Sequence, residues 1–231
     1  MDRFTKDSKI IDLIETNYHL LPVINRFGIR LGNKDKSLDK ICSSLNVNVD
    51  FFLTIINTFH NENYFPEEEL KAFSPLLIID YLKKTHQHYA EYVLPKLENL
   101  LNQLILSSQT DTQQLNIIQK FYEKYKTELL LHVQEEEDIV FPYIQQLIKN
   151  KKIDKKYTIH SFEKEHSNVE IKLNDLKNLI VKYIEPVYND NICNEFLITL
   201  FRFEKDINDH TRIEDKILTP QVAEIERKIN G

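Results

Sequence analysis

The stretch HVQEEEDIVFP, from His132 to Pro142, places a histidine four residues before a glutamate within a long helical pattern. The stretch HTRIEDKILTP, from His210 to Pro220, repeats this spacing near the end of the chain. Residues four apart lie on one face of an α-helix, so each histidine shares a face with the glutamate that follows it. Two such pairs at matched positions indicate a common structural purpose.

Outward from these stretches, the whole chain reads as all-α. Its 231 residues are 42% hydrophobic, which is enough to bury a core, and the three glycines are too few for many strands joined by tight turns. Four long amphipathic patterns cover residues 76–107, 112–150, 155–184 and 188–230, with short polar segments between them. Short connections of this kind favour an antiparallel up-down-up-down four-helix bundle.

Each of the four patterns carries an apolar stripe at helical spacing, and each stripe is interrupted by polar residues. The expected stripes are Ile79, Leu82, Val93, Leu97, Leu100 and Leu104; Phe121, Tyr125, Leu129, Ile139, Tyr143 and Leu147; Ile159, Phe162, Val169, Leu173, Leu176 and Ile180; and Phe196, Leu200, Phe203, Ile207 and Ile217. The interruptions are His86, His132, Glu136, His166, His210 and Glu214. Polar groups inside a core are unfavourable unless they bind something, so these six side chains predict a shared ligand.

A metal centre explains the six residues together. The chain contains two helical hairpins of one design, each with a lone histidine followed by the His-x-x-x-Glu pair, offset by 80 residues for His86 and His166 and by 78 for the pairs. Four imidazoles and two carboxylates suit iron, manganese or zinc, and carboxylates that can bridge favour two ions over one. We therefore expect two iron ions between the helices.

Other histidines and acidic residues near these positions are assigned different roles. His88 lies two residues from His86 and therefore points to the other side of its helix. We expect His86 to be the ligand in the first pattern, with His88 as the alternative. We expect structural or solvated roles for His19, His60 and His160, and a solvated charge run at Glu135, Glu137 and Asp138.

The remaining sequence predicts a second, smaller unit. Residues 1–65 contain short helical patterns typical of a compact module. The stretch NENYFPEEELKAFSP, from Asn61 to Pro75, has two prolines and a charge cluster and reads as the linker to a bundle at 76–231. Cys42 and Cys193 fall in different units without paired spacing, so we expect two reduced cysteines.

Charge and hydropathy limit the partners and the compartment. A formal net charge of −6 argues against nucleic acid as the main partner. No apolar run is long enough to span a bilayer, and the opening stretch MDRFTKDSKIIDLIE lacks the hydrophobic core of a signal peptide. These features predict a cytoplasmic protein without a membrane partner.

The metal motifs resemble those of a known family. HVQEEEDIVFPYI resembles the H-x-x-x-E-E-x-x-x-F-P signature of hemerythrin-like domains, EKEHSNVEIKL resembles their third-helix E-H segment, and HTRIEDKILTP resembles their fourth-helix H-x-x-x-E. With the small N-terminal module, nearly the full chain is similar to the RIC (repair of iron centres) family. That module typically carries a Cys-Cys pair, whereas the corresponding stretch here, RFGIRLGNKDK, has no cysteine.

The resemblance implies a function and a cofactor. It implies two non-haem iron ions with oxo and carboxylate bridges, held by His86, His132, Glu136, His166, His210 and Glu214. It further implies a role in restoring iron-sulfur clusters damaged by nitric oxide or oxidative stress, with damaged iron-sulfur proteins and the gases nitric oxide and oxygen as partners. The alternatives are a di-iron reductase of nitric oxide or peroxide, and an oxygen or nitric oxide sensor that signals through the N-terminal module. The oligomeric state is open, with a homodimer as one option.

Overall fold

The computed structural model describes residues 3–61, 63–108, 113–150, 158–159, 168–184 and 188–230. The secondary structure of these residues is helical, apart from one isolated bridge between Lys9 and Ser37. The predicted all-α class is therefore confirmed. Within the same ranges, every helix is too short or too polar to span a bilayer.

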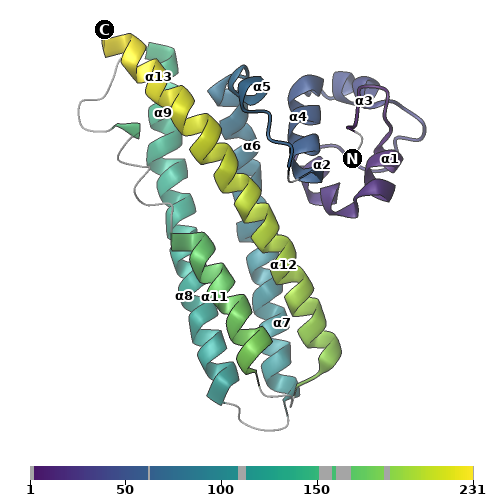
Figure 1. Ribbon diagram of the computed structural model, residues 1–231, viewed down its shortest axis with the longest axis vertical. Coiled ribbons are helices and arrows are strands. Elements are labelled where there is room, and N and C mark those ends of the chain that lie inside the picture. The colour runs from purple at the N-terminus through teal and green to yellow at the C-terminus, as the bar shows by residue number, and fades with distance from the viewer. Residues whose placement is uncertain are drawn as a thin grey trace.

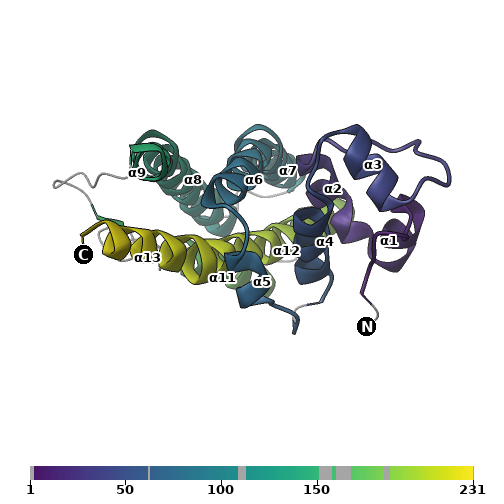
Figure 2. The same cartoon turned by 90° about the horizontal axis from the view of Figure 1, so that it is seen from above.

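The N-terminal module is built from short helices. They are α1 (Ile10–Thr16), the 3-10 turn η1 (Tyr18–Leu20), α2 (Leu21–Arg26), α3 (Leu38–Ser44) and α4 (Val49–His60). The chain turns between α2 and α3 at Gly28 and Gly32, whose positive φ angles of 73° and 92° favour glycine. The Asn48 side chain caps α4 by accepting the N–H of Phe51 at 2.9 Å. This module lies against the side of the long helices (Figures 1 and 2).

The longer helices lie side by side along the long axis of the molecule (Figure 1). They are α6 (Pro75–His88) continued by α7 (Leu94–Ser107), α8 (Gln113–Glu135) continued by α9 (Phe141–Asn150), α11 (Asn168–Tyr183), and α12 (Asp190–Ile213) continued by α13 (Thr219–Asn230). A short helix, α5 (Glu67–Lys71), occupies part of the predicted linker. The up-down-up-down order of four helices depends on residues 151–157 and 160–167, which lie outside the described ranges, and stays a prediction.

A π-helical turn interrupts each of the three continued helices. These turns are η2 (Tyr89–Val93), η3 (Glu136–Val140) and η4 (Glu214–Leu218). The residue after each turn donates its N–H to the carbonyl five positions earlier. That residue is followed in each case by a proline: Pro95, Pro142 or Pro220. Proline lacks an N–H and its ring clashes with the carbonyl four residues earlier in a regular helix, so a wider turn accommodates it.

The wide turns change which residues face the core. Most of the described stripe residues are buried as predicted, but Ile139 is 48% exposed and Val140, next to it, is fully buried. The extra residue in η3 rotates the following helix by about 100°, because an α-helix has 3.6 residues per turn. The prediction of Ile139 in the core was wrong for this reason.

The buried apolar side chains form two clusters that divide the long helices crosswise. One cluster combines the N-terminal module with α6, α9 and α13, and includes Ile24, Phe52, Leu82, Phe141 and Ile217. The other fills the opposite half with α7, α8, α11 and α12, and includes Tyr89, Leu129, Leu176 and Phe203. The module thus shares one core with half of the bundle, and the boundary between units at 1–65 and 76–231 stays a prediction. Cys42 and Cys193 are both free and buried, one in each cluster.

An ion pair between a buried arginine and a half-buried aspartate joins the module to the long helices. The side chain of Arg26, at the end of α2, is 2% exposed and donates from Nη1 to Asp206 Oδ1 on α12 at 2.8 Å. A second bond joins Nη2 to Asp206 Oδ2, and Nη1 also donates to the Tyr81 hydroxyl on α6 at 3.2 Å. Because the guanidinium binds both oxygens of Asp206, it fixes the orientation as well as the position of the module.

Candidate metal centre

Four of the six predicted ligands meet where the two apolar clusters adjoin. His86 lies near the end of α6, His210 near the end of α12, and Glu136 and Glu214 are the first residues of the π-turns η3 and η4. All four are buried, with exposures between 0% and 6%. One ligand atom from each lies within 4.8 Å of those of the others. The structure therefore gathers side chains from three separate helices into one polar layer.

The distances show the donor atoms converging. His86 Nε2 lies 3.2 Å from His210 Nε2, and His210 Nε2 lies 3.0 Å from Glu214 Oε1. The second oxygen of Glu136, Oε2, lies 3.1 Å from His86 Nε2. Two imidazole nitrogens at this separation hydrogen-bond only if one carries a proton, whereas both can donate their lone pairs to one cation between them.

The carboxylate of Glu136 faces two histidines. While Oε2 lies close to His86, Oε1 lies 3.3 Å from Nε2 of His132, which comes one turn earlier on α8. The His132 side chain is 19% exposed, so it forms the outer side of the group. The two oxygens of this carboxylate therefore face imidazoles from two different helices.

The chemistry of this group fits a metal cation. Two carboxylates and neighbouring imidazoles are buried between apolar walls, where unpaired charges carry a large desolvation cost. A divalent ion would balance both negative charges and bind the imidazole lone pairs at the same time. Nitrogen and oxygen donors without sulfur are typical of sites for iron, manganese or zinc.

A comparison with protein-family models matches residues 77–222, more than half of the chain, to the hemerythrin HHE cation-binding domain. The chain belongs to this family. The match extends from α6 to α13 and contains every residue of the buried group. A comparison with curated proteins found no match. The buried group lies inside the matched domain and could hold the cation, and we refer to it as the hemerythrin-like site.

Sequence reasoning missed one residue beside the hemerythrin-like site. Glu137, expected in a solvated charge run, accepts a hydrogen bond from His86 Nδ1 at 3.1 Å. Burial alone would lower the pKa of His86, but its bonds to Glu136 and Glu137 outweigh burial and raise that pKa to about 9. The same bond lowers the pKa of Glu137. The repeated glutamates of the HVQEEED stretch were the available signal, whereas Glu135 and Asp138 are exposed as expected.

The structure separates the two histidines of the first helix. His86 enters the buried group, while His88 lies on the module side of α6 and stacks on Tyr92 with ring centroids 5.4 Å apart. Burial, with the nearby Arg26 guanidinium, lowers the pKa of His88 to about 4. His166, the predicted third-helix ligand, and His160 lie outside the described residues. His19 and His60 belong to the module, away from the site.

A tyrosine occupies the position in the first helix that glutamate occupies in the other two. Tyr89, Glu136 and Glu214 each begin a π-turn and each precede a proline by six residues. Tyr89 is 1% exposed, and it lines a small cavity of about 20 Å³ together with His132, Glu136, His210 and Glu214. Its hydroxyl has no hydrogen-bond partner within the described ranges. The ring centroid of Tyr89 lies 5.7 Å from that of His210.

Proposed function

We propose that the chain is a non-haem di-iron protein that helps to repair iron-sulfur clusters damaged by nitric oxide or oxidative stress, and that it does so in the cytoplasm by supplying iron. The observation that carries the proposal is the buried Glu136 carboxylate, with His86 at one oxygen and His132 at the other. One ion would bind on each side of this bridge. His166, from the third helix of an up-down-up-down bundle, would complete the six-residue set with His210 and Glu214.

The protein residues would hold, orient and shield the ions. Glu136 and Glu214 would balance positive charge in a dry interior, and Glu137 would orient His86 through its Nδ1 hydrogen bond. The buried side chains of Leu129 and Ile207 form an apolar wall of the cavity that the site residues line. Bound iron would supply a redox-active centre able to bind small gases, and Tyr89 would offer a hydroxyl proton on the same side.

An acidic hollow on the surface favours iron supply over a closed storage site. This hollow, of about 560 Å³, reaches His86 and Glu137 and is also lined by Asp80, Glu91 and Asp138. Four carboxylates against Lys83 and Lys84 give the hollow a negative balance. Such a surface attracts cations, so it is a suitable route between the buried site and an acceptor protein.

Reactivation of a damaged enzyme tests this function. An iron-sulfur enzyme inactivated by nitric oxide would be incubated with the iron-loaded protein, with the metal-free protein, or with an iron-loaded sample of a variant. We expect activity to return only with the iron-loaded protein. Glu136→Ala should fail after the same loading procedure, whereas Glu135→Ala, which changes an exposed neighbour, should restore activity fully. Equal recovery with metal-free protein would reject iron supply as the mechanism.

A sensor is the second candidate, because the module contacts the wall of the site. The Arg26 guanidinium lies 5.7 Å from the ring centroid of Tyr89, and Tyr89 lines the cavity of the hemerythrin-like site. A change at the metal that moves Tyr89 would thus reach the module directly. If the chain is a sensor, binding of iron or of nitric oxide should change the rate of backbone hydrogen exchange in α2. Exchange rates that stay the same with and without iron, and with and without nitric oxide, would exclude this candidate.

A further inference from the structure

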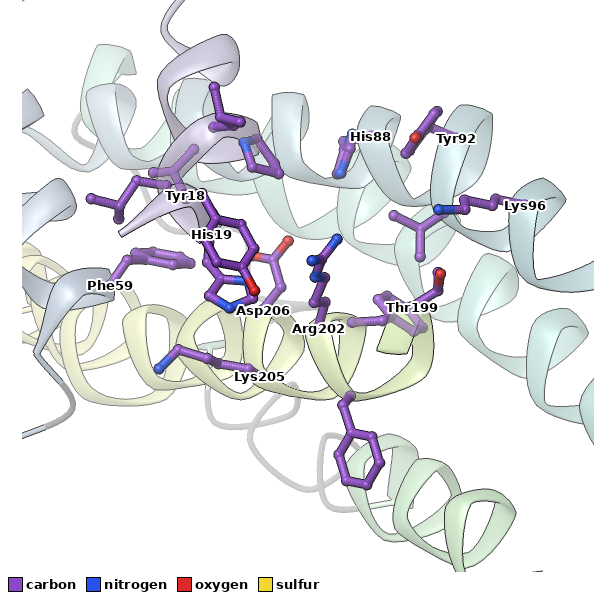
Figure 3. A pocket seen from close by; sticks show the side chains of 17 residues that line it. Tyr18, His19, Phe59, His88, Tyr92, Lys96, Thr199, Arg202, Lys205 and Asp206 are labelled. Atoms are coloured by element: carbon purple, nitrogen blue, oxygen red, sulfur yellow. The ribbon is translucent and has the colours of Figure 1, made fainter. Parts of the chain in front are cut away.

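A second cavity lies between the N-terminal module and the long helices, apart from the hemerythrin-like site. It has a volume of about 430 Å³, within the range of small-molecule sites, and Figure 3 shows the side chains around it. Its walls come from η1 and α2 of the module, from the end of α4, and from α6, α7 and α12. A ligand here would contact both parts of the chain at once.

The cavity has an apolar floor and exposed aromatic rings at its edge. Buried side chains of Leu20, Val23, Phe59, Val93 and Phe203 form the floor. At the edge, Tyr18, Tyr92 and Phe201 are 55%, 58% and 48% exposed. Lys177 of α11 lies over the Phe201 ring, so the rings of Tyr18 and Tyr92 are the ones that offer apolar faces to a flat group at this cavity.

Positive charge is concentrated at this cavity although the chain as a whole is acidic. Lys96, Arg202 and Lys205 line it, and the one carboxylate among its lining residues, Asp206, binds the Arg26 guanidinium through both oxygens. Lys96 pairs with Glu195 at 2.8 Å. The Arg202 charge also acts on Glu195, but Arg202 forms no ion pair at contact distance in the described part of the chain. Burial lowers the pKa of His19, and the charges of Arg202 and Lys205 lower it further, which reflects the positive potential.

Arg202 is placed to bind an anion above an aromatic ring. Its guanidinium carbon lies 5.2 Å from the ring centroid of Tyr18, and Figure 3 shows the side chain extending from α12 toward the middle of the cavity. A guanidinium presents paired N–H groups that match a carboxylate or phosphate, and stacking on a ring leaves those groups free to donate.

We propose that this cavity binds a small organic anion with a flat apolar body, in which Arg202 pairs with the anionic group and Tyr18, Tyr92 and the apolar floor contact the body. An aryl carboxylate and a nucleoside monophosphate share this chemistry. Because both the module and α12 contribute contacts, the bound anion would also strengthen the contact between them.

Calorimetric titration of the full chain tests the proposal with defined probes. We expect saturable binding of one equivalent of 2-naphthoate or of AMP, and the tighter of the two identifies the natural class as carboxylate or nucleotide. The neutral analogue 2-naphthamide should bind at least roughly tenfold more weakly than 2-naphthoate, because it cannot form the charge-assisted bonds to Arg202. Equal binding of the amide and the carboxylate, or no binding of either anion, would overturn the proposal.

Substitutions locate the bound anion. Arg202→Gln should weaken binding of the better probe roughly tenfold, and Arg202→Lys should recover part of the loss because it restores the charge without the fork. The matched control is Arg227→Gln, an exposed arginine on α13 that does not line the cavity, and it should leave the affinity unchanged. Circular dichroism of each variant verifies the fold. Unchanged affinity in Arg202→Gln, or an equal loss in Arg227→Gln, would place the binding elsewhere.

Discussion

At the scale of single residues, Glu137 is the side chain through which the protein can tune its metal site without touching the metal. It accepts the His86 Nδ1 hydrogen bond, and such outer partners fix the tautomer and orientation of a metal-binding imidazole. Glu137→Gln should therefore weaken iron binding by about ten- to a hundred-fold in a competition assay with a chelator. Asp138→Asn, at an exposed neighbour, is the control and should bind iron normally. A normal affinity for Glu137→Gln would mean that His86 needs no outer partner.

Tyr89 allows a second test at the residue scale. Its hydroxyl is buried without a partner in the described ranges, so Tyr89→Phe should change the free energy of unfolding of the metal-free protein by less than about 1 kcal/mol. The optical spectrum of the iron-loaded variant under nitric oxide should differ from that of the parent protein, because the nearest hydroxyl donor is gone. Identical spectra would show that the hydroxyl does not approach the gas. Tyr92→Phe, on the outer surface, controls for loss of a hydroxyl alone.

At the scale of the secondary-structure element, the π-turns align the ligands with the core. The turn η3 begins at Glu136 and adds one residue before Val140 and Phe141, so both the carboxylate and the following apolar residues point inward. Deletion of the exposed Ile139 should remove the extra residue, rotate one side of the helix relative to the other by about 100°, and reduce bound iron. Iron content by elemental analysis and helix content by circular dichroism measure both effects. Ile139→Ala keeps the residue count and should keep the iron, whereas full iron content in the deletion variant would contradict a role for the turn.

At the scale of the whole molecule, the Arg26–Asp206 pair connects the module to the helix that carries His210 and Glu214. Removal of one member of a buried pair leaves a charge without a counterion, so Asp206→Ala should destabilise the protein by about 3 kcal/mol. The double substitution Arg26→Met with Asp206→Leu should recover most of this loss, because neither charge then remains buried. Chemical denaturation of the metal-free protein gives both values. If the double variant is no more stable than Asp206→Ala, the loss comes from packing and not from the unpaired charge.

The sequence by itself determined the helices, their apolar faces and the residue types of the metal site, because helical periodicity is a local property. It identified six residues as one polar set: His86, His132, Glu136, His166, His210 and Glu214. The five of them that the structure describes, all except His166, lie together. The family match from residue 77 to 222 agrees with the motifs that the sequence shows.

Only the tertiary structure decided which side chains meet across helices. It placed His86 in the site and His88 at the module, brought Glu137 to His86, and exchanged Ile139 for Val140 in the core. It also joined the module and half of the bundle into one apolar cluster. The physical reason is that one added residue in a π-turn rotates everything after it, and that contacts between helices depend on packing over many residues distant in sequence.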